Sequence, residues 1–272
     1  LARPFQQETA LYRTGIAVGD YPIDHHHAAY TDQSKVPDLH FYPVPSYSLP
    51  MGTLIPKETE DLIVAEKSIS VTNIVNGTTR LQPVCMLNGQ AAGVMAALAS
   101  QKGITPGALS VREVQNHLLE SGAYIRPYSD VSPDASFWVD VQKTGATGII
   151  KGEGKNVGWE NHTLFHPDSV MVASALRKGL GELPGNFEPQ FEGEVVSLQE
   201  GLDTALALAS HFENGNGNDA PEKWLDDLWQ LHDFGKPEPE KPVTRAQMAV
   251  LLNSIARPFD VLEVDLKGRY VQ

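Results

Sequence analysis

The stretch from Asp61 to Ala99 constrains the fold of this chain more than any other. It begins with a short apolar run, Leu62 to Ala65, which predicts a strand, and it continues through a turn-rich middle from Asn73 to Gln82. A Gly/Ala-rich segment from Asn88 to Gln101 then predicts a helix, which Gly103 ends. Strand, loop and helix in this order form a common ligand-binding unit, because a helix N-terminus offers free N–H groups and a partial positive charge.

The start of this predicted helix is built from small residues. Gly89, Ala91, Ala92 and Gly93 allow a flat ligand or another backbone to approach closely. Two interpretations follow from the residues alone, which are tight packing of the helix against a strand and contact with a ligand.

The composition argues against several classes of partner. The net charge of −13 and the pI of about 5.1 are unfavourable for nucleic acid and for an anionic membrane surface. No apolar run approaches the roughly 20 residues of a membrane span. The single Cys85 excludes an internal disulfide and a cysteine-based zinc site, and we expect a buried, inert thiol and no metal centre.

Three polar residues of the first 80 positions, His25, His27 and Arg80, are candidates for contact with a substrate. Thr14 to Val18 predicts a strand, and a turn and then Asp24 to His27 follow. Adjacent side chains on an extended chain point to opposite faces, so at most His25 and His27 converge. They are candidates for moving a proton beside a substrate, and the alternative is a polar loop with one buried histidine. Arg80 is a candidate for holding a substrate carboxylate or a cofactor, and a surface ion pair is its alternative.

Beyond Arg126 and Pro127 the chain becomes mainly helical. Capped apolar patterns predict helices over Trp138–Thr144, Val170–Leu180, Leu198–Phe212, Pro221–His232 and Thr244–Ile255, and the alternation of Val261–Leu266 predicts a terminal strand. The pattern is weakly repeated, because the order of residues after Trp138 parallels the order after Trp224.

The first part of the chain resembles the C-terminal portion of FAD-dependent oxidoreductases of the glutathione-reductase-like superfamily. The motifs that carry the resemblance are GDYPIDHHH (19–27), TLIPK (53–57), LIVAEKSIS (62–70), TRLQPVCMLNGQAAG (79–93) and LSVREVQNHLLESGAY (109–124). The resemblance implies that the helix N-terminus faces the pyrimidine edge of a flavin, where a reduced flavin carries negative charge.

The resemblance also implies the cofactor-binding residues. They are Ala65, Glu66, Asn88, Gly89, Gln90, Ala91 and Ala92. Glu66 stands where this family usually has a glycine, as part of Ala-Gly-Arg. The sequence contains no GxGxxG fingerprint, so we expect that an N-terminal FAD-binding half is missing, that this chain is a fragment, and that it does not retain FAD on its own.

The region from Tyr128 to about Phe259 is similar to S-layer homology domains. The carriers are Tyr128-Ser129-Asp130-Val131, Trp138, GIIKG (148–152), Phe165-x-Pro167 and VTRAQMAVLL (243–252). This similarity implies a possible cell-envelope glycan as a partner, with Arg245 at a helix start. Trp159, in a polar loop, is a further residue able to stack on a sugar.

The sequence therefore predicts an α+β fold, with a mixed β/α flavoprotein segment (1–126) followed by a mainly α-helical, S-layer-homology-like module (127–272). The predicted function is hydride transfer between a flavin and a small-molecule substrate. The alternative is a non-catalytic, extracytoplasmic, carbohydrate-associated binding protein or an accessory part of a polysaccharide-degrading enzyme. An extracytoplasmic or cell-envelope location is favoured over the cytoplasm.

Overall fold

The computed structural model of the chain describes residues 10–24, 44–212 and 221–271. These residues form a mixed α and β fold, which confirms the predicted α+β class. The strands are β1 (Gly15–Gly19), β2 (Tyr47–Pro50), β3 (Glu153–Val157) and β4 (Glu160–Leu164). The α-helices are α1 (Asn73–Thr79), α2 (Gln82–Lys102), α3 (Val111–Glu120), α4 (Trp138–Thr147), α5 (Ala173–Leu180), α6 (Leu198–His211), α7 (Pro221–Leu231), α8 (Arg245–Leu251) and α9 (Pro258–Val261). Short helical turns lie at η1 (Ala10–Thr14), η3 (Met51–Leu54), η4 (Glu66–Ser68), η5 (Pro106–Ala108) and η6 (Leu252–Ala256).

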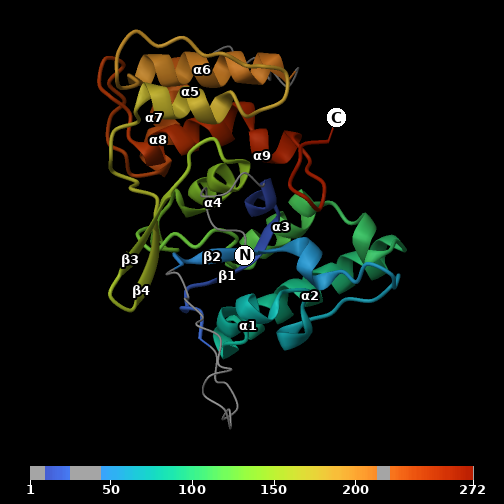
Figure 1. Cartoon of the computed structure of the whole chain (residues 1–272). Coiled ribbons are helices and arrows are strands. Elements are labelled where there is room, and N and C mark those ends of the chain that lie inside the picture. The colour runs from blue at the N-terminus through green and yellow to red at the C-terminus, as the bar shows by residue number, and fades with distance from the viewer. Residues whose placement is uncertain (1–9, 25–43, 213–220, 272) are drawn as a thin grey trace.

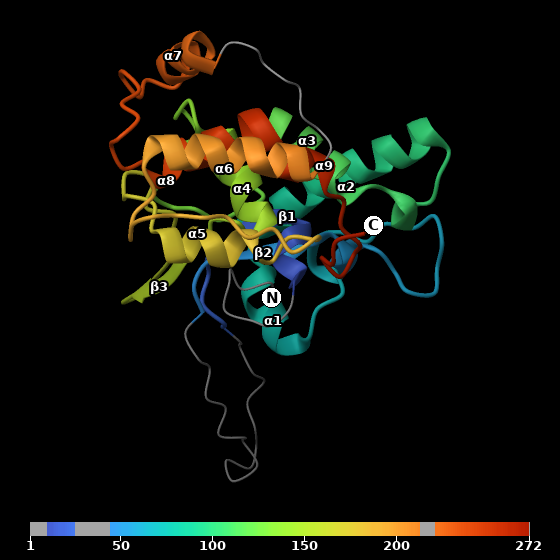
Figure 2. The same cartoon turned by 90° about the horizontal axis from the view of Figure 1, so that it is seen from above.

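The elements are arranged along one direction, with α1 and α2 at one end and α5, α6, α7 and α8 at the other (Figure 1). The β1–β2 pair and α4 lie between them, and the view from above shows α7 at the periphery, beyond α6 (Figure 2). Buried apolar side chains from both ends, such as Met95 of α2, Val141 of α4 and Leu208 of α6, belong to one continuous core cluster. Within the described parts of the chain, no helix is long and apolar enough to cross a membrane.

The predicted strand at Thr14–Val18 is confirmed as β1. It pairs antiparallel with β2, which follows Pro45 and ends at Pro50 in a proline-rich segment. Gly19 ends β1 against the ring of Tyr47, where an added Cβ would lie 2.5 Å from the phenol oxygen. The pairing therefore depends on glycine at this position, because no larger residue fits beside the tyrosine.

The stretch from Asp61 to Ala99 differs from its prediction in two places. The segment Leu62–Ala65 is not a strand, and it is attached to η3 by single backbone hydrogen bonds, such as Val64 N to Leu54 O at 2.8 Å. The turn-rich middle forms the short helix α1, and α2 begins at Gln82 rather than at Asn88. Pro83 lies in the first turn of α2, where a proline costs no hydrogen bond and its fixed φ suits a helix.

The other helix predictions are confirmed, with differences of a few residues at their ends. Gly103 and Gly148 end α2 and α4 in left-handed conformations, with φ of 63° and 84°. Ser110 accepts a hydrogen bond from Glu113 N and begins α3, and Thr244 caps α8 in the same way. The predicted terminal strand at Val261–Leu266 is wrong, since α9 ends at Val261 and only an isolated bridge joins Val264 to Tyr270.

The second part of the chain contains three equivalent helix starts, although the sequence indicated only two. The segments before α5, α6 and α8 form a closed ring of backbone hydrogen bonds: Met171 N to Val243 O, Val243 N to Val196 O, and Val196 N to Met171 O, at 2.8–2.9 Å. The copy at Val196 escaped detection because no Trp-x-Asp pattern precedes it, whereas one precedes each of the other two, at Trp138 and Trp224.

The predicted domain boundary coincides with a buried contact. Arg126 is completely buried, and its N–H and carbonyl both bond to the side-chain amide of Gln142 in α4. Its guanidinium donates to Tyr12 O at 2.8 Å and to Ser48 Oγ at 3.2 Å. The two predicted segments therefore meet through buried polar contacts, and the division at residue 126 remains a prediction.

Candidate functional site

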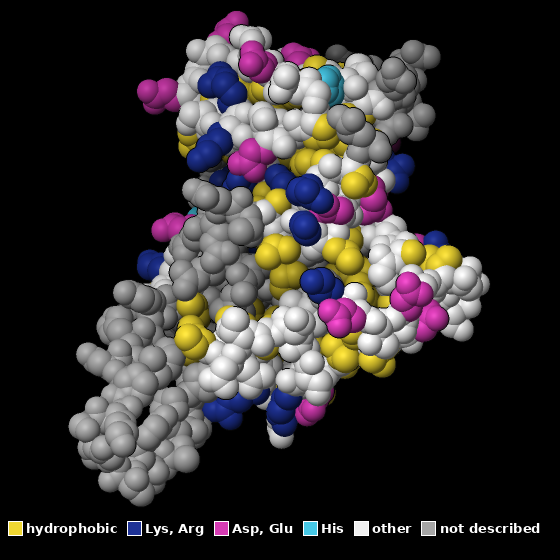
Figure 3. Space-filling model, turned by 45° about the vertical axis from the view of Figure 1, so that its right-hand side comes forward, with side chains coloured by type: hydrophobic (Ala, Val, Ile, Leu, Met, Phe, Trp, Pro, Cys, Tyr) yellow, Lys and Arg dark blue, Asp and Glu magenta, His cyan; other side chains and the backbone are white. Residues whose placement is uncertain are grey.

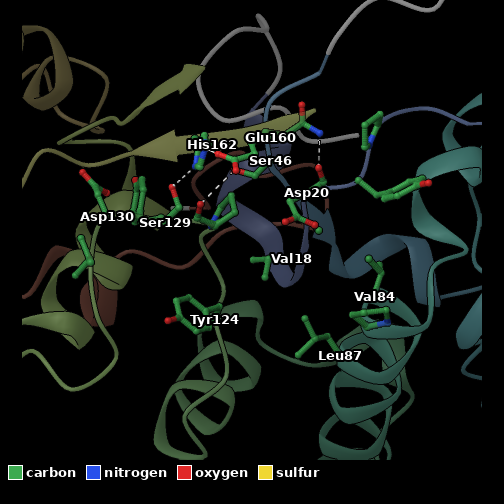
Figure 4. A pocket seen from close by; sticks show the side chains of 18 of the residues that line it. Val18, Asp20, Ser46, Val84, Leu87, Tyr124, Ser129, Asp130, Glu160 and His162 are labelled. Atoms are coloured by element: carbon green, nitrogen blue, oxygen red, sulfur yellow. Dashed lines mark hydrogen bonds and ion pairs between the residues drawn. The ribbon is translucent and has the colours of Figure 1, made fainter. Parts of the chain in front are cut away.

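The largest cleft described here, which we call the α2 cleft, opens at the N-terminal end of α2 and has a volume of about 980 Å³. Its lining comes from Ser46 and from four segments of the sequence. They are Val18–Pro22, Pro83–Leu87 at the start of α2, the segment Tyr124–Pro133, and Trp159–His162 on the β3–β4 hairpin. Figure 4 shows Val18, Val84, Leu87 and Tyr124 along one side of the cleft and Asp20, Ser46, Glu160 and His162 along the other.

The GDYP motif is held at the edge of this cleft by buried contacts. Thr78 Oγ1 of α1 donates to Tyr21 O at 2.5 Å and lies 2.7 Å from the hydroxyl of Tyr47. Thr78 and Tyr47 are buried, and burial raises the pKa of the Tyr47 phenol above its usual range. The motif that carried the family resemblance thus has a defined place beside the start of α2.

The helix N-terminus that the sequence placed at Asn88 lies one and a half turns earlier. Leu81 is the extended N-cap of α2, and Cys85 N donates back to Leu81 O at 3.0 Å. The N–H groups of Gln82 and Val84 have no acceptor within an α-helix, and Pro83 has no N–H. Since Pro83 and Val84 line the cleft, the positive end of the helix dipole opens onto it.

Asn88 and Glu66 are joined by two hydrogen bonds. Glu66 N donates to Asn88 Oδ1 at 2.7 Å, and Asn88 Nδ2 donates to Glu66 O at 3.1 Å. Glu66 has a φ of 61°, a left-handed conformation that favours glycine, which is the residue the related family has at this place. Asn88 is fully buried, so its amide fixes the loop and does not face a ligand directly.

The carboxylate of Glu66 turns into solvent. It is 63% exposed and pairs with Lys67 at 3.2 Å, and hydrogen bonding to Lys67 lowers the pKa of the carboxyl. Ala65 precedes it as an extended, half-buried residue. The carboxylate therefore does not crowd the space beside the loop, as a carboxylate pointing inward at this position would.

The small residues of α2 do not all serve one purpose. Ala91 is buried on the core side, and Ala92 is half-buried. Gly89 and Gln90 are exposed, and a Cβ added at Gly89 would meet no atom within 4 Å. Gln90 Nε2 donates to Ser121 Oγ at 3.4 Å, but Gly89 and Gly93 face open space, so packing against a strand does not explain these glycines.

Arg80 lies at the other predicted part of the site. Its guanidinium is 3.7 Å from the carboxylate of Asp24 and donates to Asp24 O at 3.4 Å. The pair is about one-third exposed, so it contributes little to stability. It places Arg80 directly beside the residue that precedes His25, while His25 and His27 themselves lie outside the described residues.

The sequence did not predict the contribution of the β3–β4 hairpin. His162 Nδ1 is 3.1 Å from Ser129 Oγ, and Nε2 is 2.9 Å from Glu160 Oε2 (Figure 4). Glu160 and His162 are two residues apart, so on a strand they share a face. That spacing was the available signal, but the segment was read as a loop and Ser129 lies too far away in sequence to be connected with it.

Cys85 is buried, and its Sγ lies 3.9 Å from Thr79 O. Burial raises the pKa of the thiol, which agrees with the predicted inert cysteine. Among the side chains that the structure describes, no three or more His, Cys, Asp or Glu residues are arranged to hold a metal ion.

Residues 5–118 match a family model described as FAD dependent oxidoreductase. The match covers less than half of the chain but includes every motif on which the flavoprotein resemblance rested, apart from the last residues of the segment 109–124. Comparison with curated proteins and with solved structures gives no match. The similarity of the second part of the chain to S-layer homology domains remains a prediction.

Proposed function

We propose that this chain carries the flavin-facing portion of an FAD-dependent oxidoreductase, with the isoalloxazine ring in the α2 cleft. The observation that carries the proposal is the meeting of two separate family motifs, GDYP and the LQPVC segment, at the N-terminus of one long helix. The family match over residues 5–118 supports the same cofactor class.

The residues of the cleft fit one end of FAD. The N–H groups of Gln82 and Val84 are suited to the electron-rich pyrimidine edge, and Val18, Leu87 and Tyr124 provide an apolar wall for a flat ring. When bound, a flavin supplies hydride transfer at its N5 atom. The buried amide of Asn88 would keep the Ala65–Glu66 backbone in place, and Gly89, Gln90 and Ala92 would contact the partner domain from the helix.

The substrate side is proposed to include His25, His27 and Arg80. Arg80 supports this because its contact with Asp24 brings a cation next to the histidine run. In this role an imidazole accepts the proton that leaves a substrate as the hydride departs, and Arg80 holds an electron-rich group of the substrate.

The open side of α2 supports the expected partner, an FAD-binding half that grips the ADP moiety. Met86 is 75% exposed, and Gly89 and Gly93 meet nothing within 4 Å. A helix that is apolar around its whole circumference is normally covered on all sides. This chain alone is therefore expected to be purified without stoichiometric FAD.

The test is a titration of the purified chain with lumiflavin, which has the isoalloxazine ring without the ADP moiety. We expect saturable quenching of lumiflavin fluorescence, which Leu87→Trp, at a half-buried position in the lining, abolishes by filling the cleft. Met86→Trp, on the exposed side of the same helix, is the matched control and leaves binding unchanged. Absence of binding, or equal binding by both variants, contradicts the proposal.

A second candidate function is glycan binding by the helical part of the chain. The specific observation is a small cavity of about 190 Å³ in which Lys151, Lys178 and Arg245 meet. Arg245 donates to Phe165 O and to Lys151 O, both at 2.6 Å, so it also holds the backbone around the cavity. Lys151 is paired with Glu182, but Lys178 and Arg245 add positive charge that, in a chain of net charge −13, favours an anionic glycan. Loss of binding to such a glycan in Lys178→Glu, with Lys236→Glu as the exposed control, tests this candidate.

A further inference from the structure

The tip of the β3–β4 hairpin forms one rim of the α2 cleft, and its position is fixed. Val157 pairs with Glu160, so Gly158 and Trp159 make a two-residue turn, and the φ of 60° at Gly158 suits such a turn. Asn161 Nδ2 donates to Asp20 O, and Asn156 Nδ2 donates to Val44 O at 2.7 Å. These side-chain bonds connect the hairpin to the segment that carries the GDYP motif.

Trp159 is placed where it cannot serve the core. Its side chain is 89% exposed, whereas Trp138 and Trp229 are 4% and 2% exposed. An exposed indole is a large apolar surface on an otherwise polar hairpin, and such surfaces mark binding sites when polar groups surround them. Trp159 lines the α2 cleft together with Glu160, Asn161 and His162.

The polar groups beside the indole are held in place by their neighbours. His162 is fixed between Ser129 Oγ and the carboxylate of Glu160. The carboxylate of Asp130 is committed to the backbone, since it accepts from Phe165 N at 2.7 Å and from His166 N at 2.6 Å. Hydroxyl-binding groups at the rim are therefore oriented before a ligand arrives, which lowers the entropy cost of binding.

The lining has two unlike sides, an apolar wall and a polar rim, as Figure 4 shows. A sugar ring has the same division, with C–H groups on its faces and hydroxyl groups around its edge. Asp20, Asp130 and Glu160 line the cleft, so an anionic ligand is disfavoured in a chain that already has a net charge of −13.

We infer that the hairpin side of the α2 cleft binds a neutral carbohydrate chain. Trp159 stacks on the face of one sugar ring, and Asp20 and Glu160 hydrogen-bond its hydroxyl groups, while His162 holds the Glu160 carboxylate in position. The binding site stands without a flavin. The identification of this carbohydrate as the redox substrate rests on the proposed function, which places the isoalloxazine at the other side of the same cleft.

The experiment is a calorimetric and tryptophan-fluorescence titration of the full chain with neutral glucan, xylan, mannan and N-acetylglucosamine pentasaccharides, and with oligogalacturonate as the anionic arm. We expect saturable binding of at least one neutral oligosaccharide. Trp159→Ala should weaken it by about tenfold, equivalent to about 1.4 kcal/mol. Asp20→Asn should weaken it by a few-fold, and Val157→Ala, exposed on the same hairpin but outside the cleft, should not change it.

The inference is overturned if none of the neutral oligosaccharides binds, if binding survives Trp159→Ala, or if oligogalacturonate binds more tightly. Circular dichroism of each variant shows that the fold is kept. Because every measurement is made without flavin, failure here leaves the lumiflavin result intact, and failure with lumiflavin leaves the oligosaccharide result intact. If both ligands bind, lumiflavin in the cleft should change the oligosaccharide affinity, since the two share one cavity.

Discussion

Replacement of Glu66 by glycine should stabilise this chain, although it removes a charged side chain and an ion pair. Glu66 has a φ of 61°, and a non-glycine residue pays about 1–2 kcal/mol for a left-handed conformation. Glycine in turn loses about 0.4–1 kcal/mol through the greater entropy of the unfolded chain. The pair with Lys67 is exposed on both sides and contributes little. The expected net effect is an increase of about 0.5–1 kcal/mol in the free energy of unfolding.

The assay is urea unfolding of three variants, followed by circular dichroism. Glu66→Gly should raise the urea midpoint. Glu66→Gln removes the charge without relieving the backbone and should leave the midpoint nearly unchanged. Glu58→Gly, in an exposed loop without positive φ, should lower it or have no effect. If Glu66→Gly destabilises the chain as Glu58→Gly does, the assignment of a glycine-type conformation at this position is refuted.

Three further substitutions test other parts of the structure. Asn88→Ala should cost about 2–3 kcal/mol in unfolding free energy, because it leaves the Glu66 N–H and carbonyl without their partner, as measured by urea denaturation. Gly19→Ala should cost about 1–3 kcal/mol, since its Cβ would lie 2.5 Å from the Tyr47 oxygen, as measured by thermal unfolding. Asp140→Asn should raise the melting temperature at pH 8 and not at pH 4. Burial raises the pKa of this carboxyl to about 7, so the folded state binds more protons than the unfolded state between about pH 4 and 7, and stability falls by up to about 4 kcal/mol across that range.

Two of these substitutions have a control within the chain. Gly89→Ala is the control for Gly19→Ala, and it should stabilise α2 by about 0.5–1 kcal/mol because its Cβ enters open space. Asp134→Asn, on an exposed loop, is the control for Asp140→Asn. Equal effects of the two glycine variants, or a stability gain for Asp140→Asn that is the same at pH 4 and pH 8, contradict the stated causes.

Caps and glycine signals predicted helices well in this chain. Ser110, Thr244, Gly103 and Gly148 mark helix ends that the structure reproduces, because each residue satisfies backbone groups locally. The start of α2 was placed too late because the prediction rested on the Gly/Ala-rich run from Asn88, whereas the helix begins at Gln82 and accepts Pro83 in its first turn without cost.

Most of the remaining errors in the predicted secondary structure arise where an element depends on contacts between segments that are distant in the sequence. The run Leu62–Ala65 has strand composition, but the described residues offer it no neighbouring strand, so it stays irregular. The hairpin β3–β4 is polar on almost every residue, and its pairing and its contact with Asp20 were invisible to hydrophobic patterning.

The candidate site was predictable only in part, for the same reason. The motifs predicted α2 and the GDYP turn, which Thr78 of α1 holds through Tyr21 O, but they predicted neither the third copy of the helix start at Val196 nor the histidine at 162. Those residues act through neighbours far away in the sequence.

The central claim is that the N-terminus of α2, and not its middle, faces a flavin. Amide NMR spectra of the chain titrated with lumiflavin test it most directly. We expect the largest chemical-shift changes at the N–H groups of Gln82 and Val84 and at those of Asp20 and Tyr21. Shifts confined to Gly89–Gly93 on the open side of the helix, or no shifts at all, would contradict it.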